Sequence, residues 1–475
     1  MKKINWLAFL TIAILTVLAF TAGVTTTYLL LEANQGPALD DEESATFAEF
    51  WNVWRELQLH HYFFDEDVDL ARGAIEGMIA ATGDAYTSFH TLSEFENAMS
   101  HLRESFYGIG AEVNVINGDI TISPMAGSPA ENHGVLPGDV VISVDGEDVT
   151  GEDVGAVIDR IRGEYETVVT LGILRGTDAI HLEITRGRIL NETVTFDTFE
   201  ANGKTIGFVR VSTFGETTSR DFALAIDDLD QIGIDGLIID MRNNAGGYLS
   251  AVNDMVSYLL PSGLPITAAI DRDGRGIVHS TTGSTTHRLD VEIVTLINGG
   301  SASASEIFAA AMIESGDFEV IGTTSFGKGT VQQARPISDN SMLQLTIQAW
   351  ETPNGHLIEG SGVTPTIYVE ASEFLQIVPV SLLDADVLVY DMVHPGVMSA
   401  QLILDTLGYF VNRTDGYFDS STTLALQSFQ ADHELDPTGT IDRATATSLS
   451  MALRDRARDP VHDVQIQAAI DWFNQ

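Results

Sequence analysis

Two segments of the chain carry residues that could form a catalytic serine site. Residues 298–303 (NGGSAS) lead into an alanine-rich run, 303–314, that is expected to be helical. A serine at a helix N-terminus lies beside unpaired backbone N–H groups and the positive end of the helix dipole, which stabilise a developing anion. The second segment places Lys328 between Gly327 and Gly329. These residues predict a Ser303 nucleophile whose proton is taken by the amine of Lys328.

The expected elements bring the two segments together. A helix of about 12 residues runs ~18 Å away from Ser303, and a strand of about five residues, 318–322, returns ~17 Å. Burial removes water from the lysine ammonium and lowers its pKa, so that a neutral amine can act as a base. Gln332 lies four residues further along an extended segment, on the same side as Lys328, and can orient the amine.

Each of these residues also has a structural explanation. Ser303 with Glu306 forms an S-x-x-E capping box, the commonest reason for a serine before a helix. Lys328 could instead pair with an acidic neighbour. Another turn, residues 240–247, follows an expected buried strand and ends in Gly246 and Gly247. Adjacent glycines allow backbone N–H groups to face an oxyanion, or they simply form a tight βα turn.

Composition excludes several classes of protein. The formal charge of −44, from 68 acidic and 24 basic residues, makes nucleic-acid binding untenable. Dispersed acidic residues suit a solvated surface at high salt or high pH. The chain has no cysteine, which excludes disulfides, thiolate metal sites and a cysteine nucleophile. No H-E-x-x-H motif is present, so we expect no metal and no cofactor.

The first residues predict a membrane anchor. Residues 6–31 carry no charge, and roughly 26 helical residues span a ~30 Å hydrocarbon layer. Lys2 and Lys3 precede this run and Glu32 follows it, which places the N-terminus in the cytoplasm and the remainder outside. A cleaved signal peptide is the competing interpretation. We expect a single-pass protein of the cell membrane whose catalytic part is extracytoplasmic.

The remaining pattern predicts a multidomain α/β protein. Residues 1–36 form the cytoplasmic stub and transmembrane anchor, and 37–102 a helical region with a break at Gly83-Asp84. Residues 103–188 alternate short strands with Gly and Pro turns, with one helix at 154–162. Residues 189–380 alternate strands (205–211, 237–241, 291–298, 318–322) with helices (219–231, 249–260, 303–314), as in a parallel α/β core. Residues 386–475 are expected to form a small helical module.

Two blocks, GSASASEIFAAAM and GTTSFGKGTVQ, resemble the signatures of the carboxy-terminal processing (tail-specific) proteases. The resemblance implies a Ser303–Lys328 dyad with Gln332 as the orienting residue. It also implies an oxyanion hole from the amides of Ala304 and of Gly246 or Gly247. Two positions depart from the family pattern: Ala245 stands where proline is usual and Thr366 where aspartate is common.

Residues 103–188 resemble a PDZ domain, although a glycine-rich hairpin is the alternative. The segment similar to its carboxylate-binding loop comprises Tyr107, Gly108, Ile109, Gly110 and Ala111. Such a loop binds a peptide C-terminus while the peptide adds as a strand to the sheet edge. Arg162 matches a recurrent arginine of the family's PDZ domain, which implies a link between peptide binding and activation.

Residues 398–453 resemble the three-helix peptidoglycan-binding module, through segments such as 415–418 (DGYF) and 425–430 (ALQSFQ). Asp419 departs from the glycine frequent there. The matching apolar residues are mostly core, so they indicate the fold more directly than wall binding.

Taken together, these features predict a membrane-anchored serine endopeptidase that processes proteins recognised by their C-terminal tails at the cell wall. Its expected partners are substrates with exposed C-termini, the membrane, peptidoglycan and a second copy of the chain. A catalytically silent PDZ and cell-wall scaffold is one alternative. A Ser-His-Asp hydrolase is another, since 12 histidines are present, although no G-x-S-x-G motif surrounds Ser303.

Overall fold

The computed structural model describes residues 41–65, 68–116, 118–176, 178–283, 289–380, 382, 387–458 and 460–475. The predicted membrane segment, 6–31, lies outside these residues. Within the described ranges, no helix is both long and apolar enough to cross a membrane. The chain divides into two compact units, residues 1–83 and 84–475.

The described part of the first unit contains two helices, α2 (Asp41–His60) and α3 (Leu70–Ala80). The side chain of Asp69 caps α3 by accepting a hydrogen bond from the Arg72 N–H at 3.0 Å. Large apolar side chains of α2, among them Phe47, Trp51 and Leu59, are exposed. The prediction of helices in this region is confirmed.

The second unit begins with a short strand and helices that lead into a small β domain. They are β1 (Ser88–Thr91), α4 (Leu92–Met99) and η1 (Ser100–Leu102). A two-stranded antiparallel link, β2 (Ser105–Gly108) with β9 (Gly187–Leu190), then joins the β domain to the rest of the unit.

The β domain is a sheet in the order β3-β4-β5-β7-β8, packed over a core of aliphatic side chains. Its strands are β3 (Ala111–Ile116), β4 (Asp119–Pro124), β5 (Asp139–Val144), β6 (Glu147–Asp148), β7 (Val168–Arg175) and β8 (Asp178–Thr185). Its helices are α5 (Pro129–Asn132) and α6 (Val154–Ile161). The strand and helix predictions for residues 103–188 are therefore confirmed.

The next domain is built on a six-stranded sheet in the order β10-β11-β12-β15-β16-β19, parallel except for β10. The strands are β10 (Val194–Ala201), β11 (Lys204–Val211), β12 (Gly236–Asp240), β15 (Glu292–Ile297), β16 (Glu319–Gly322) and β19 (Ile367–Tyr368). The four parallel strands expected from the sequence are all present. Adjacent parallel strands need crossover helices, which explains the alternation of strands and helices along the chain.

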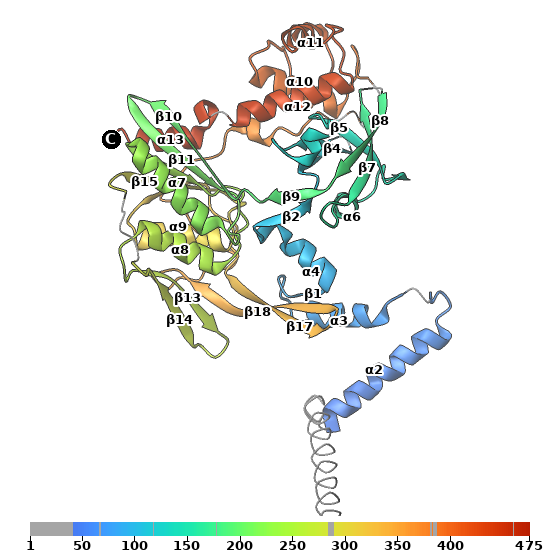
Figure 1. Cartoon of the computed structure of the whole chain (residues 1–475), viewed down its shortest axis with the longest axis vertical. Coiled ribbons are helices and arrows are strands. Elements are labelled where there is room, and N and C mark those ends of the chain that lie inside the picture. Colours follow the sequence, from blue (N-terminus) through green and yellow to red (C-terminus); the bar gives the residue numbers. More distant parts are fainter. Residues whose placement is uncertain are drawn as a thin grey trace, which may run out of the picture. The chain divides into compact units, whose positions relative to one another are not determined.

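Helices cover both faces of this sheet (Figure 1). On one face lie α7 (Thr218–Ile232), α8 (Leu249–Leu259) and α9 (Ala304–Glu314). The other face is covered by α13 (Val464–Trp472), close to the end of the chain. Successive side chains of a strand point to opposite faces, so Leu237 and Ile239 face the first group while Ile238 faces α13.

A second, five-stranded sheet lies beside the first. It consists of β1, β13 (Pro265–Asp271), β14 (Gly276–Ser280), β17 (Thr330–Ser338) and β18 (Ser341–Glu351). Its long β17–β18 hairpin begins two residues after Lys328. The sequence pattern did not predict this sheet.

The C-terminal module has the predicted three helices, α10 (Pro395–Thr406), α11 (Ser420–Asp432) and α12 (Arg443–Arg458), around its own apolar core. Short helices η2 (Glu373–Gln376) and η3 (Pro460–His462) flank it. The sequence prediction grouped all of 386–475 with this module, whereas α13 packs on the six-stranded sheet.

Candidate active site

The backbone at Ser303 is held in an unusual conformation. Between β15 and α9 the chain turns sharply, and Ser303 has φ +56° and ψ −113°. A non-glycine residue at such angles costs about 1–3 kcal/mol and persists only where its surroundings enforce it. Those surroundings include Ser301, whose Oγ donates to the Met241 carbonyl, and Ser305, whose Oγ donates to the Asn244 carbonyl, both at 2.8 Å. The serines on either side of Ser303 are thus structural.

Glu306 joins the Ser303 turn to the Lys328 loop. Its fully buried carboxylate accepts the N–H of Ser303 at 2.7 Å and the N–H of Lys328 at 2.9 Å through Oε2. Through Oε1 it accepts the N–H of Gly327 at 2.7 Å and the hydroxyl of Ser325 at 2.5 Å. From the sequence, Glu306 is recognisable only as part of a capping box. Its additional bonds to residues 19–22 positions away could not be found from local spacing.

The Lys328 side chain is partly buried in the same region. Burial lowers its pKa, while the negative charges of Glu359 and Glu306 oppose that effect by raising it. Its Nζ lies 5.0 Å from the ring centroid of Tyr86, a cation–π contact. Within the described chain, no hydrogen bond joins Lys328 Nζ to Ser303 Oγ, so the amine is near the serine turn but rests on an aromatic ring.

Gln332 is the second residue that the sequence assigned to the base. It lies in β17, and its Nε2 donates to the hydroxyls of Thr330 at 2.9 Å and Thr346 at 3.3 Å. The side chain thus faces the same pocket as Lys328 but is held by two threonines.

The glycine turn lies directly against the Ser303 turn. A Cβ added to Gly246 would lie 2.8 Å from the Ser303 Cβ and 3.0 Å from the Ala304 N, so only glycine allows this approach. The Gly246 N–H already donates to Asn244 Oδ1 at 2.9 Å. Gly247 forms a parallel bridge with Phe214, in which the Gly246 carbonyl accepts the Phe214 N–H and the Tyr248 N–H donates to the Phe214 carbonyl. In such a bridge the N–H of Gly247 itself points away from Phe214. The Ala304 N–H, first in α9, has no acceptor within the helix.

These residues meet in one cavity of about 510 Å³. Its lining includes every residue that the sequence assigned to catalysis and the oxyanion hole: Ser303, Lys328, Gln332, Ala304, Gly246 and Gly247. Exposed His101 from η1 also lines it. In the described ranges, no three or more His, Asp and Glu side chains are grouped so that they could hold a metal ion.

Comparison with known proteins identifies the family. The Peptidase family S41 profile matches residues 205–369, a PDZ domain profile matches 121–175, and a peptidoglycan binding domain profile matches 393–449. Carboxy-terminal processing protease CtpB of Bacillus subtilis (strain 168) is 37% identical over 404 residues, which cover 84% of this chain and 83% of the relative. Carboxy-terminal processing protease CtpA of the same organism is 32% identical over 467 residues, 97% of this chain and 98% of the relative.

The chain belongs to the carboxy-terminal processing protease family. It is a serine peptidase with a PDZ domain and a domain of the peptidoglycan-binding family, as the sequence predicted. The six-stranded sheet, with the second sheet beside it, is the protease core, and the small β domain is the PDZ domain.

The five residues expected to bind a peptide C-terminus lie where the β2–β9 link enters the PDZ domain. Tyr107 and Gly108 end β2, Ile109 and Gly110 follow, and Ala111 begins β3. Gly110 has φ +70°, and a Cβ there would lie 2.6 Å from the Ser128 Cβ. A larger residue at Gly110 would therefore disturb the domain itself as well as any bound peptide.

Arg162 connects the PDZ domain to the wall of the catalytic cavity. Its Nη1 donates to Ser100 Oγ at 2.9 Å, and its guanidinium lies 4.9 Å from the centroid of the Phe106 ring. Met99 and His101, on either side of Ser100, both line the catalytic cavity. The arginine is thus one residue removed from the pocket wall.

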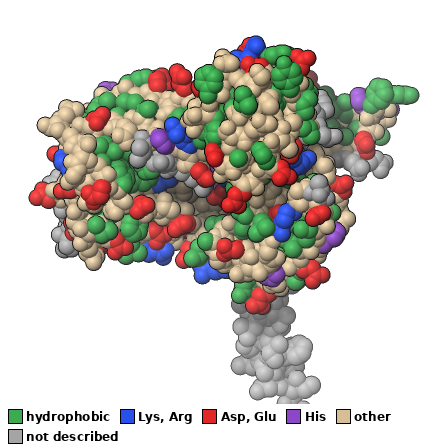
Figure 2. Space-filling model, turned by 90° about the horizontal axis from the view of Figure 1, so that it is seen from above, with side chains coloured by type: hydrophobic (Ala, Val, Ile, Leu, Met, Phe, Trp, Pro, Cys, Tyr) green, Lys and Arg blue, Asp and Glu red, His purple; other side chains and the backbone are tan. Residues whose placement is uncertain are grey.

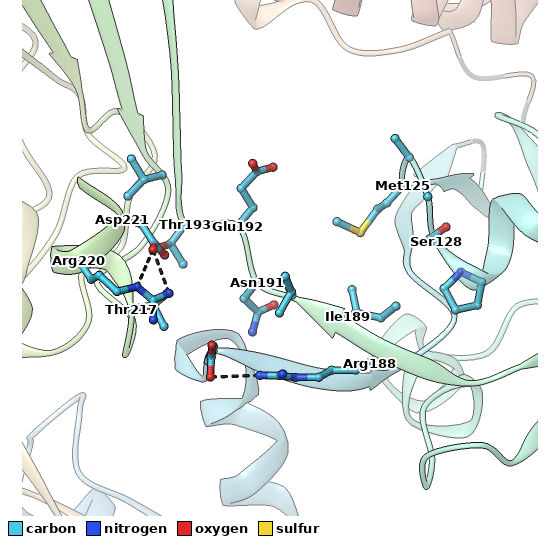
Figure 3. A pocket seen from close by; sticks show the side chains of 16 residues that line it. Met125, Ser128, Arg188, Ile189, Asn191, Glu192, Thr193, Thr217, Arg220 and Asp221 are labelled. Atoms are coloured by element: carbon cyan, nitrogen blue, oxygen red, sulfur yellow. Dashed lines mark hydrogen bonds and ion pairs between the residues drawn. The ribbon is translucent and has the colours of Figure 1, made fainter. Parts of the chain in front are cut away.

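A second cavity, of about 550 Å³, lies between the PDZ domain and the protease core (Figure 3). Four of its charged groups form two ion pairs, Arg188 with Glu104 at 3.1 Å and Arg220 with Asp221 at 3.0 Å, and Glu192 also lines it. Ser303 and Lys328 do not line it. Acidic side chains elsewhere are spread over the visible surface rather than gathered at one site (Figure 2).

Proposed function

We propose that this chain is a membrane-anchored, extracytoplasmic serine endopeptidase that uses a Ser303–Lys328 dyad to process proteins recognised by their C-terminal tails. The observation that carries the proposal is the shared cavity of Ser303, Lys328 and the glycine turn. The backbone of both catalytic segments is tied to one buried carboxylate, Glu306.

The reaction follows from the positions of these groups. Neutral Lys328 takes the proton of Ser303 as Oγ bonds to the scissile carbonyl carbon. The N–H groups of Ala304 and Gly247 stabilise the resulting oxyanion, since the Gly246 N–H is already bonded to Asn244. Lys328 then protonates the leaving amine as the C–N bond breaks. It next accepts a proton from water as the water oxygen bonds to the acyl carbon. Lys328 then returns that proton to Ser303 Oγ as the acyl C–O bond breaks, which releases the carboxylic acid product and leaves free Ser303 and neutral Lys328.

The dyad needs a rearrangement before it can act in this way. Lys328 Nζ must come within hydrogen-bonding distance of Ser303 Oγ. Gln332 can orient the amine through its Oε1, while its Nε2 donates to Thr330 and Thr346. A bound tail can drive this change only through differential affinity for the competent arrangement. We propose that the PDZ domain binds the tail carboxylate with Tyr107, Gly108, Ile109, Gly110 and Ala111, and that Arg162 transmits this binding through Ser100.

The proposed location is the outer face of the cell membrane, at the cell wall. The uncharged run 6–31 behind Lys2 and Lys3 supports the anchor. The match of residues 393–449 to a peptidoglycan binding domain supports contact with the wall. Pull-down of the purified chain with insoluble peptidoglycan tests that contact, and a chain that stays entirely in the supernatant would contradict it.

Replacement of Ser303 by alanine tests the proposed nucleophile. We expect Ser303→Ala to abolish cleavage of an unstructured polypeptide while the Ser301→Ala and Ser305→Ala variants keep the same nucleophile and remain active when folded. Uncut substrates trapped in cells by Ser303→Ala would identify the physiological substrate. A wild-type chain that cleaves nothing, yet binds tails and wall, would instead support the silent scaffold.

Tail recognition is tested on the substrate side. One peptide with a free C-terminus and the same peptide amidated should differ severalfold in rate with wild type, since amidation removes the carboxylate. The Arg162→Ala variant should cleave both slowly and at similar rates. Equal rates for both peptides with wild type would remove the tail-specific part of the proposal and leave the protease part intact.

A further inference from the structure

The last helix of the chain is part of the protease core. Although α13 follows the peptidoglycan-binding module in sequence, its apolar face packs on the six-stranded sheet, opposite α9, through Ile466, Ala469, Ile470 and Phe473. A Cβ added to Gly236 in β12 would lie 3.2 Å from the Phe473 ring, so a larger residue there would require the ring to shift. The C-terminal module is thus inserted between two parts of one core.

Both ends of α13 are fixed to the core by charged groups. At its C-terminal end, the amine of Lys204 donates to the Phe473 carbonyl. At its N-terminal end, Asp463 caps the helix through Oδ1, which accepts the N–H of Gln465 at 2.9 Å and of Ile466 at 3.2 Å. The other oxygen of Asp463 is used for a different contact.

That second oxygen binds Arg242. Arg242 Nη1 donates to Asp463 Oδ2 at 2.6 Å and to Gln465 Oε1 at 2.8 Å. Its Nε and Nη2 bind the two oxygens of Asp240 at 2.8 and 2.9 Å. The side chains of Arg242 and Asp463 are only 11% and 9% exposed. Burial alone would lower the pKa of Arg242, but Asp240 and Asp463 raise it, so the guanidinium stays charged.

Arg242 is the first residue of the segment that reaches the Ser303 turn. Asn243 exchanges hydrogen bonds with Asn298, its N–H donating to Asn298 Oδ1 at 2.9 Å and its own Oδ1 accepting from Asn298 Nδ2 at 3.0 Å. The backbone carbonyl of the following residue, Asn244, accepts the Ala302 N–H at 3.0 Å and the Ser305 hydroxyl at 2.8 Å. Arg242 thus fixes the start of a segment whose next two residues contact the Ser303 turn, so its position can influence the donors proposed to face the oxyanion.

We propose that Asp463 is a positioning residue for catalysis, acting through Arg242 on the oxyanion turn at residues 243–247. The inference rests on the proposed function, because it assumes that the Gly247 N–H stabilises the oxyanion. It also predicts that the end of the chain, beyond the wall-binding module, is required for the chemical step and not only for stability.

The test separates the Arg242 contact from the helix cap. Serine is a good N-cap but too short to reach Arg242, so Asp463→Ser keeps the cap and removes the contact. Asp240 still neutralises Arg242 in this variant. Ile470→Ala is the matched control, since it loosens the packing of α13 but leaves the Arg242–Asp463 and Arg242–Asp240 pairs in place. For each full-length variant, kcat, KM and the Tm are measured on one unstructured substrate.

We expect Asp463→Ser to lower kcat by about tenfold or more with KM within about twofold, since misplaced oxyanion donors weaken only transition-state binding. Ile470→Ala should lower the Tm further but lose less kcat. A wild-type kcat in Asp463→Ser, or an equal kcat loss in both variants at equal Tm, would overturn the inference. Ser303→Ala, assayed in parallel, addresses the proposed function separately, because activity in that variant would refute the nucleophile whatever Asp463 does.

Discussion

The nucleophile and the base are held in different ways. The backbone of the Ser303 turn is held in place by its neighbours. Ser303 keeps a positive φ, Ser301 and Ser305 donate hydrogen bonds to residues 241 and 244 of the neighbouring turn, and Gly246 packs against it. The backbone of Lys328 is equally fixed by Glu306, but its side chain lies over Tyr86 rather than against the serine. The difference indicates a site whose backbone is preorganised and whose dyad is completed by side-chain rotation.

The largest effect tests whether Lys328 is the base at all. Lys328→Arg should lower kcat by about 10⁴-fold or more, because guanidinium stays protonated and cannot accept the serine proton. Wild-type kcat should rise with pH through the pKa of Lys328, which burial lowers below the ordinary 10.5, and stay high above it. A His101→Ala control should keep most of the activity. Near wild-type turnover in Lys328→Arg, or its loss in His101→Ala, would favour a histidine base.

The next effect tests the shared backbone support. In Glu306→Gln, the NH₂ of the new amide would face backbone N–H groups that donate to the carboxylate in the wild type. Two donors cannot bond to each other, so both catalytic segments should shift. We expect a loss of about 10²-fold in kcat and about 2–3 kcal/mol in the free energy of unfolding. Glu314→Gln, at the other end of α9, is the control, since Glu314 accepts one backbone N–H, from Asn354. Equal effects from the two substitutions would show that Glu306 has no special place in the site.

A smaller effect tests whether Gln332 orients the base. Gln332→Leu should lower kcat by about tenfold if the amide orients the Lys328 amine during the reaction. Gln332→Glu should move the rise of kcat to higher pH, because a carboxylate beside the Lys328 amine favours the charged form of that amine. An unchanged profile and rate in both variants would mean that Gln332 does not orient the base and serves only its bonds to Thr330 and Thr346.

The smallest effect concerns the resting contact of the base. The face of the Tyr86 ring attracts an ammonium group, so the contact is expected to favour the charged form of Lys328. Tyr86→Leu should therefore move the rise of kcat to lower pH, whereas Tyr86→Phe, which keeps the ring, should leave it in place. Identical profiles for these two variants would show that the cation–π contact does not influence the base. The pH profile of kcat at saturating substrate is the measurement.

Local pattern predicted much of this protein. The alternation of strands and helices predicted the parallel strands β11, β12, β15 and β16 and the helices between them. The lengths of α9 and β16 also account for the return of the Lys328 loop to Ser303. Such inferences succeed because periodicity and element length depend on residues adjacent in sequence. The turns of the β13–β14 and β17–β18 hairpins do carry local signals, Asp273-Gly274 and Asp339-Asn340, which the sequence prediction did not use.

The sequence by itself determined which residues could carry the chemistry: a serine at a helix start, a lysine between glycines, and a paired glycine turn. Only the tertiary structure decided how they are used. It committed the Gly246 N–H to Asn244, made Glu306 a link between two loops, placed Lys328 over Tyr86, and brought Asp463 from the chain's end to Arg242. In each of these contacts, the packing of the folded chain determines which partner the side chain or amide meets. A hydrogen-bonding group of given type has many acceptable partners, and only the folded arrangement of the core selects one.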